Sequence, residues 1–336
     1  MPELLLVSAL CCAAMTVALV RMLRPVRRGE TALRALLATV CAASVTVSAG
    51  VATGADTAEF LLASSFAVAP VSILLAAAAE EARPGRRGVG WALVAVWALV
   101  VYPVCAVIPP LVFDACAASE CRVQDFGGGL ALLVSAAAAV LLAWRVSTDA
   151  VREDWRHFAL PVLGVWVSGA VWLASLEGVL DAYTPRILLA ALVAPIGGAI
   201  AWVLVDALRR APRHPLRSAA DGVLAGLVAI VPGAAGISFP WSLLVGALAG
   251  ASAALVFGLR RLSSAGRAGH WALVVLASTA IGYLAPAVAG DSIGFVFSGR
   301  ITAVVPPALA FLAVAAAGVL LTVPVWAARP VAVRGH

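Results

Sequence analysis

Long apolar runs separated by short arginine-rich segments make up most of the chain. The first run covers about Leu4 to Val20, and four arginines follow it between positions 21 and 28. A signal peptide carries its positive charges before the apolar stretch, so this run is expected to remain as a first helix. A helix of about 20 apolar residues crosses a bilayer. The pattern therefore predicts eleven spans, at about 4–20, 33–53, 59–79, 89–112, 126–145, 158–179, 187–208, 219–236, 241–260, 269–288 and 303–328.

Arginine accounts for all 23 basic residues, and the arginines gather between the apolar runs. Positive charges close to membrane spans favour the cytoplasmic side. With eleven spans and the N-terminus outside, only Arg122, Arg186 and Arg300 fall in outside segments, and the other twenty fall in inside segments. One missed or extra span would scramble this division. The charges therefore predict that the N-terminus lies outside and the C-terminus inside.

The odd number of spans favours two five-helix repeats plus one extra helix, and repeats with an odd number of helices must be inverted. No soluble segment interrupts the chain, so residues 1–336 are expected to form a single transmembrane domain. Small residues four apart share a helix face, as in Ala194 with Gly198 and Gly246 with Gly250. Such pairs let helix backbones approach closely in lipid. The chain is therefore predicted to be an all-α integral membrane protein.

Composition excludes several classes of protein. The chain is 63% hydrophobic and 12% charged, with a mean hydropathy of +1.04. A soluble domain is about 45–50% apolar and about 25% charged, so a soluble enzyme, a disordered tail and a nucleic-acid binder are excluded. The net charge of +6 then reflects orientation in the membrane rather than nucleic-acid binding. We expect a multi-pass protein of the cell membrane, surrounded by lipid.

Motifs for catalysis and metal binding are missing from the sequence. It has no HExxH, no GxSxG and no GxxxxGK[ST], and the glycines at 127–129 lack the lysine and hydroxyl of a phosphate loop. Cys116 and Cys121 share one loop without a histidine or a second cysteine pair, which disfavours a zinc site. They would form a disulfide if that loop faces the oxidising side. The sequence indicates no enzyme, no metal and no cofactor.

A few polar residues lie at the edges of apolar runs. His270 opens the tenth run and is either an interfacial ring or an imidazole that faces a pore, since an ionisable group inside a span is costly. Asp125 begins the fifth run, where it would cap the helix by accepting bonds from free amides, and capping does not exclude a part in shaping a pore. Asp206 and Asp221 flank an arginine cluster and are interpreted as solvated or paired.

Three stretches resemble the ammonium transporter (Amt/Mep/Rh) family, in the form of a shortened and divergent member. Asp-Phe-Gly-Gly-Gly at 125–129 resembles the family's Asp-Phe-Ala-Gly-Gly at the start of its fifth helix. Ala-Gly-Leu-Val-Ala-Ile-Val-Pro at 225–232, with Ser-Phe-Pro-Trp at 238–241, resembles its Ala-Gly-Leu-Val-x-x-Thr-Pro and Ser-Pro-Trp. Phe66 precedes Glu80 by fourteen residues, as a pore-gating phenylalanine precedes the family's Ala-Glu-Arg.

The resemblance implies eleven helices and a pore for ammonium, or for ammonia with or without its proton, in each protomer of a homotrimer. In such a pore the ion gives up its proton at a gate of two phenylalanines, and two histidines, one from each repeat, pass on the molecule and the proton. The gate positions fall on Phe66 and Leu62. The relay positions fall on His270, twelve residues before Gly282, and on Leu133, where the first pore histidine is missing.

Departures from the family pattern leave three functions open. Leu133 removes half of the relay, Leu262 replaces an acidic residue, and the glycine- and aromatic-rich motif of the sixth helix is not recognisable around 169–175. The leading hypothesis is a channel or transporter that moves ammonium or ammonia. The second is a non-conducting sensor or assembly partner, and the third is a pore for another small neutral solute. A PII-type regulator is a disfavoured partner because the tail beyond Ala328 is short.

Overall fold

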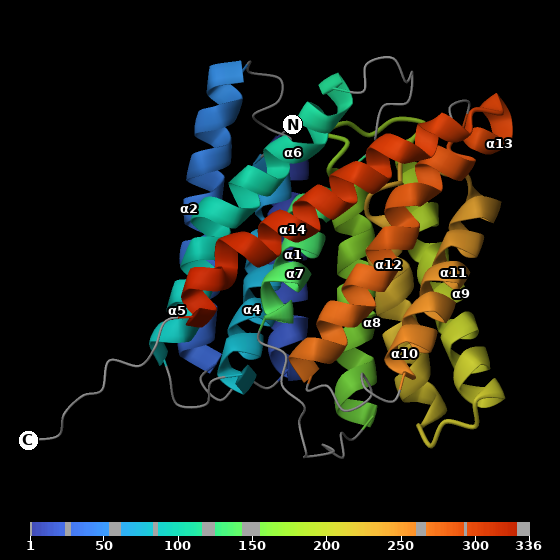
Figure 1. Ribbon diagram of the computed structural model, residues 1–336, viewed down its shortest axis with the longest axis horizontal. Helices are drawn as coiled ribbons and strands as arrows, with labels where there is room; N and C mark the ends of the chain where they lie inside the picture. Colours follow the sequence, from blue (N-terminus) through green and yellow to red (C-terminus); the bar gives the residue numbers. More distant parts are fainter. Residues whose placement is uncertain are drawn as a thin grey trace, which may run out of the picture.

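A bundle of helices forms the body of the molecule (Figure 1). The computed structural model describes residues 2–23, 28–53, 62–82, 87–115, 125–142, 155–259, 267–291 and 294–327. The helices are α1 (Pro2–Leu23), α2 (Arg28–Thr53), α4 (Val68–Ala82), α5 (Arg87–Val96), η1 (Trp97–Val101), α6 (Tyr102–Ala115), η2 (Leu130–Val134), α7 (Ser135–Leu141), α8 (Trp155–Ser175), α9 (Thr184–Leu208), α10 (Pro215–Ile230), α11 (Phe239–Phe257), α12 (Arg267–Ala289), α13 (Phe295–Ser298), η3 (Ile301–Val304) and α14 (Val305–Ala327).

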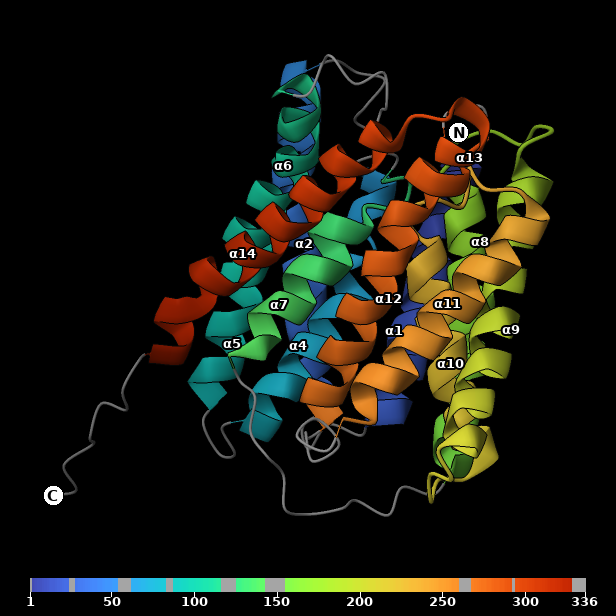
Figure 2. The same ribbon diagram turned by 45° about the vertical axis from the view of Figure 1, so that its right-hand side comes forward.

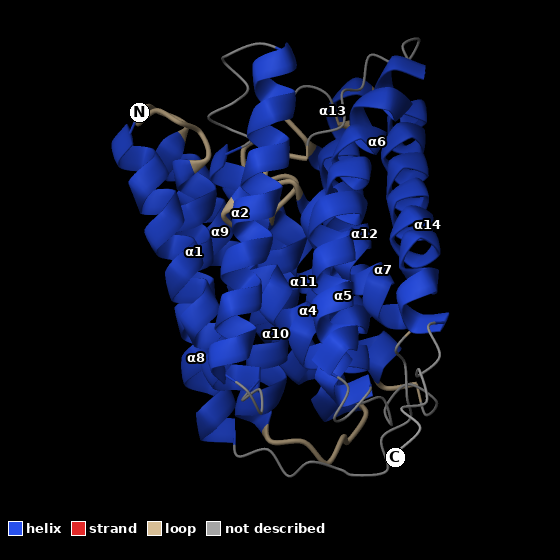
Figure 3. Ribbon diagram, turned by 90° about the vertical axis from the view of Figure 1, so that its left-hand side faces the viewer, coloured by secondary structure: helices blue, strands red, loops and turns tan. Residues whose placement is uncertain are grey.

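The prediction of an all-α membrane protein is confirmed for the part of the chain that the structure describes, where helices and loops are the only structures drawn (Figure 3). Eight helices in this part are long and apolar enough to cross a membrane: Glu3–Leu23, Leu62–Ala82, Gly88–Val112, Phe158–Ser175, Thr184–Leu208, Phe239–Phe257, Gly269–Ala289 and Ile301–Ala327. The apolar helix Leu130–Leu141 is shorter. The eleven-span count and the orientation of the termini stay predictions, and Cys116 and Cys121 lie outside the described residues.

Proline fixes the starts of three successive helices. Pro185, Pro215 and Pro240 each occupy one of the first two positions of α9, α10 and α11. At that position the missing N–H has no partner to lose, and the fixed φ of proline already suits a helix. His214 adds a cap to α10, because its Nδ1 accepts a hydrogen bond from the N–H of Leu216 at 3.3 Å. The polar turns between these helices are thus defined by local sequence.

Large aliphatic side chains cover the outside of the bundle. Leu204 on α9, Leu248 on α11 and Leu312 on α14 are each at least half exposed. Seen from a second direction, α14 lies obliquely across the bundle, with α7 and α12 beside it (Figure 2). In water so much exposed apolar surface would drive aggregation, whereas hydrocarbon tails solvate it at no cost. The surface therefore fits a protein embedded in lipid.

Backbone-to-backbone contact joins α9 to α10 and α11. A methyl group added at Gly198 would meet the carbonyl oxygen of Gly222, and one added at Gly246 would meet that of Ala194. Gly250 is pressed against Gly198 in the same way. The two pairs of small residues recognised in the sequence thus face each other across one interface. Lipid tails are as apolar as leucine, so close packing of this kind is the main force that holds such helices together.

Gly198→Val is expected to destabilise the fold by roughly 1–3 kcal/mol or more, because the added side chain has to push α10 away from α9. Thermal unfolding in detergent, followed by tryptophan fluorescence, measures the effect as a lower melting temperature. Gly88→Val is the matched control, since a methyl group there meets nothing within 4 Å. Equal melting temperatures for the two variants would contradict the importance of the interface.

Candidate functional site

Two unwound segments meet at the centre of the bundle. The N–H of Phe126 donates to the carbonyl of Pro232 at 2.9 Å, and the N–H of Gly127 donates to that of Val231 at 3.1 Å. The first segment precedes η2 and the second follows α10. The first supplies N–H donors, and the second supplies the carbonyl acceptors for them. A methyl group at Gly127 would meet the side chain of Val231 and crowd Leu173, which explains the glycine. Two of the motifs recognised in the sequence are therefore in direct contact.

Asp125 caps the short helix that follows it. Its carboxylate accepts hydrogen bonds from the N–H of Gly129 at 2.6 Å and from the N–H of Leu130 at 3.0 Å. Gly128 has φ +65°, a left-handed conformation that glycine adopts without the strain of a Cβ atom. The acid and the glycine together turn the chain sharply into η2. This turn sets the direction in which η2 and α7 enter the core.

A π-helical stretch carries Leu133 into the centre. Leu130–Val134 is π-helical, and a second π-helical stretch, Trp97–Val101, interrupts the helix formed by α5 and α6. The two helices are linked by the indole N–H of Trp97, which donates to the hydroxyl of Ser135 at 2.9 Å in a fully buried position. Isolated π-helical turns occur often at functional sites. Leu133 itself is half-buried and packs against the main hydrophobic core.

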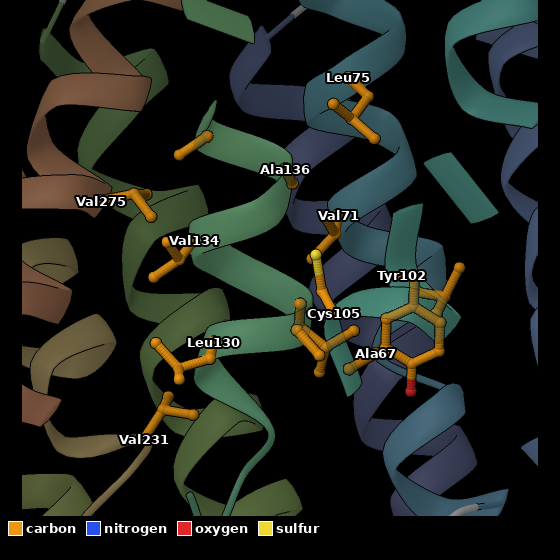
Figure 4. Packing of buried hydrophobic residues seen from close by; sticks show 14 of the residues in the cluster. Ala67, Val71, Leu75, Tyr102, Cys105, Leu130, Val134, Ala136, Val231 and Val275 are labelled. Carbon is orange, nitrogen blue, oxygen red and sulfur yellow. The ribbon is translucent and has the colours of Figure 1, made fainter. Parts of the chain in front are cut away.

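Most of the side chains drawn around this stretch are aliphatic, and Tyr102 and Cys105 lie among them (Figure 4). We call the following residues the central apolar layer: Val71 and Leu75 from α4, Leu130 and Val134 from η2, and Val275 from α12. Each of them is at most 4% exposed, and all belong to one core cluster against which Leu133 also packs. A layer so apolar disfavours a charged species strongly, since an unpaired ion in such an environment is very costly.

The proposed gate residues lie just before α4 in the chain. Phe66 occupies the turn just before α4, is half-buried and packs against the same core cluster as Leu133. Leu62 lies one helical turn earlier and is also half-buried. Its carbonyl accepts a hydrogen bond from the hydroxyl of Ser65 at 2.7 Å.

His270 has different neighbours. Its Nε2 lies 3.3 Å from Oδ1 of Asp221, and its ring meets the ring of Phe257 edge-on with centroids 4.2 Å apart. Val274, four residues later on the same face of α12, packs in a separate cluster around Trp202. Several residues of α12 belong to the cluster against which Leu133 packs, among them Val275, which lies on another face of the helix from His270. His270 thus contacts Asp221 and two aromatic rings, and its relay role with Leu133 stays a prediction.

Asp221 is the residue of this region whose burial the sequence did not reveal. It is 2% exposed, and its Oδ2 accepts from Arg213 and, at 3.2 Å, from Arg217. Asp206 accepts from the hydroxyl of Ser218 at 2.6 Å. The sequence left open whether Asp206 and Asp221 are solvated or paired. In the structure both acids are paired with arginine side chains. The four-residue spacing of Arg217 and Asp221 was the available signal, since such residues are neighbours on a helix.

The sequence profile of the Ammonium Transporter Family matches residues 38–326. No curated protein sequence matches the chain. Among solved structures, Mep2 of Candida albicans is 17% identical, with a TM-score of 0.79 over 98% of this chain and 85% of that one. Mep2 of Saccharomyces cerevisiae is 13% identical, with a TM-score of 0.75 over 96% of this chain and 83% of that one.

A structure described as a sensor Amt protein is 14% identical, with a TM-score of 0.71 over 97% of this chain and 91% of that one. At such identities the solved structures establish the fold alone. The profile match, in contrast, spans most of the chain, including all the stretches on which the resemblance was based. The protein belongs to the ammonium transporter family.

Proposed function

We propose that the protein forms a pore in the cell membrane that conducts neutral ammonia and excludes the ammonium ion. The observation that carries this proposal is the central apolar layer, which belongs to the core cluster against which Leu133 packs. An ammonium ion that enters such a layer loses the hydration of its charge, which costs far more free energy than the loss of a few hydrogen bonds by neutral ammonia. The family of the chain supports the choice of ammonia among small neutral solutes.

In this proposal Phe66 and Leu62 form the gate, and Asp125 holds the pore helix in place. The half-buried positions of Phe66 and Leu62 beside the core support a gating role. In place of the relay role expected for His270, this proposal takes Val275 of the central apolar layer as the partner of Leu133. The ammonium ion then loses its proton before the layer, and no proton follows the molecule through it. Transport is electrically silent.

A jump in ammonium concentration outside proteoliposomes is expected to raise internal pH quickly without a transient current, because only the uncharged molecule enters. A pH-sensitive dye and a solid-supported-membrane recording measure the two signals. Leu133→Trp fills the layer and is expected to abolish the fast pH change. The matched control is Leu312→Trp, at a lipid-exposed position of α14, which keeps it. A current that saturates with ammonium in the unaltered protein would contradict neutral conduction.

The double variant Leu133→His and Val275→His is expected to create an electrogenic transporter, since two facing imidazoles give a proton a path through the layer. Each single variant is the control and should carry no current, because a lone imidazole in an apolar layer lacks a hydrogen-bonding partner. The measurement is the current evoked by ammonium. If either single variant carries as much current as the double one, the pairing of these positions is wrong.

A non-conducting sensor is the second candidate. It is favoured by the same apolar layer and by the likeness in fold to a structure described as a sensor Amt protein. The proteoliposome experiment separates the two candidates. Folded protein that gives neither a pH change nor a current, and whose Leu133→Trp variant behaves identically, would establish the sensor in place of the pore.

We also propose a homotrimer with one pore in each protomer, on the basis of family membership. Lateral assembly of this kind suits a protein with aliphatic side chains around its outside, because two such surfaces pack as readily on each other as on lipid. Native mass spectrometry from detergent measures the stoichiometry, for which a mass three times that of the 34.1 kDa chain is expected. A monomer that retains full ammonia conduction would contradict the need for assembly.

A further inference from the structure

The turn that ends α9 has an arginine at a position that glycine usually occupies. Arg210 has φ +53° and is the only non-glycine residue with a positive φ in the part of the chain that the structure describes. Its N–H donates to the carbonyl of Ala207 at 3.1 Å, and the N–H of Ala211 donates to that of Asp206 at 2.9 Å. These two bonds form a Schellman motif, whose left-handed residue is usually glycine because a Cβ atom is strained there. The side chain of Arg210 is therefore present at a cost in backbone strain.

No contact of the Arg210 side chain within the described residues compensates this strain. The side chain is exposed and has no hydrogen bond, ion pair or ring contact with them. The nearby acids Asp206 and Asp221 are both paired with Arg213. Strained backbone persists where the surrounding structure or a function requires it. The guanidinium of Arg210 is thus available to a ligand from outside the chain.

Arg209 supplies a second guanidinium beside it, and this one is held in place. It donates to the carbonyls of Ala254 and Leu255 at 3.3 Å each and to that of Gly258 at 2.5 Å, at the end of α11. A methyl group at Gly258 would overlap the guanidinium, so glycine makes room for it. A guanidinium has five N–H donors, and these three bonds leave two of them. Arg209 therefore joins α9 to α11 and still has donors to offer.

The charges of this turn do not balance. Residues 206–221 contain four arginines and two aspartates, which leaves an excess of two positive charges. Arg213 and Arg217 lie against the two acids and neutralise them. The excess therefore belongs to Arg209 and Arg210. Guanidinium groups match the geometry of phosphate oxygens, so two adjacent ones favour a phosphate group as the ligand.

Exposed leucines show the depth of this turn in the bilayer. Leu204 and Leu208 on α9, and Leu255 and Leu259 in and just beyond α11, are each more than half exposed. The two helices lie side by side at one edge of the bundle (Figure 2). This apolar surface ends at the arginines, and arginine side chains at the end of a span reach the level of the lipid headgroups. The arginine pattern predicts that this end faces the cytoplasm, where the leaflet contains anionic lipids.

We propose that the turn between α9 and α10 is a binding site for an anionic phospholipid of the cytoplasmic leaflet. Arg210 and the two spare donors of Arg209 hold the phosphate, and the acyl chains lie over the exposed leucines of α9 and α11. A free phosphate ion would use the arginines but not the leucines, so the leucines favour a lipid. Because Arg209 is bonded to the end of α11, the bound lipid strengthens the link between the two helices. The site does not depend on what the pore conducts.

The first experiment measures binding of the lipid. Native mass spectrometry of the protein in detergent, titrated with phosphatidylglycerol or with phosphatidylcholine, gives the dissociation constant of the first bound lipid. The unaltered protein is expected to bind phosphatidylglycerol several-fold more tightly. Arg210→Gly is expected to weaken the binding of phosphatidylglycerol about fivefold, the effect of one basic residue near an anionic lipid surface, and to leave phosphatidylcholine binding unchanged. An unchanged affinity of Arg210→Gly for phosphatidylglycerol overturns the site.

The second experiment separates binding from a structural role of Arg210. Thermal unfolding is followed by tryptophan fluorescence in detergent, with and without phosphatidylglycerol. Glycine relieves the strain, so Arg210→Gly is expected to melt about 1–2 °C above the unaltered protein when lipid is absent. Phosphatidylglycerol is expected to raise the melting temperature of the unaltered protein and to raise that of the variant much less. A variant that melts lower than the unaltered protein without lipid, and gains as much from it, overturns the proposal.

Arg21→Gln is the matched control. Arg21 is exposed in the last turn of α1, at an end that the arginine pattern also places in the cytoplasm, and its backbone is helical. This variant is expected to keep the affinity for phosphatidylglycerol. Equal weakening in Arg21→Gln and Arg210→Gly would show a general attraction between arginines and anionic lipid, and would overturn a site at Arg210.

Inorganic phosphate at the same concentration as the lipid tests the nature of the ligand. It is expected to leave the melting temperature of the unaltered protein unchanged, because it makes no contact with the leucines. A rise equal to that caused by phosphatidylglycerol would overturn the assignment of a lipid to the site.

Discussion

Hydrogen bonds between the two unwound segments at the centre of the bundle hold the whole arrangement in place. Lipid offers no partners for free backbone groups, so non-helical backbone at membrane depth has to be satisfied by protein. The N–H groups of Phe126 and Gly127 reach the carbonyls of Val231 and Pro232 for this reason. The pairing fixes the start of η2, and therefore the residues that η2 presents to α4 and α12. The apolar layer is a consequence of this junction.

The sequence was sufficient to predict the features that depend on local chemistry. Asp125 before a run of glycines indicated a helix start, and the structure has its carboxylate on the amides of Gly129 and Leu130. Small residues four apart indicated close packing, and Gly198 and Gly246 lie in such contacts. Both predictions follow from what one turn of chain can do by itself, without knowledge of its distant partners.

The position of His270 depends on features that counting along the chain does not capture. Distance from Gly282 predicts a relay role for this residue, which also depends on helix rotation, because rotation decides the side of the bundle that a residue faces. One residue is enough to change the neighbours, because Val274 packs around Trp202 while Val275 packs with Leu130. The π-helical turn at Leu130–Val134 also changes the rotation of the facing helix, and nothing in its alanine- and leucine-rich sequence announces it.

If Val275 is the partner of Leu133, as we propose, both relay positions are aliphatic. An imidazole in a dry layer needs a partner for each ring nitrogen, and a leucine opposite it supplies none, so a single histidine would be costly to bury. Once one position is leucine, the physical reason to keep histidine at the other is gone. If Val275 is the partner of Leu133, as we propose, the pair is the stable alternative to two histidines, and the pore that results is dry.

Charged residues near the ends of several described helices join neighbouring helices. Arg34 on α2 is buried, bonds Glu30 at 2.5 Å and lies 5.1 Å from the ring of Trp91 on α5. The cluster around Asp221 does the same for α9, α10 and α12. Each half of the chain is thus fastened at its end by ion pairs and at its centre by backbone bonds.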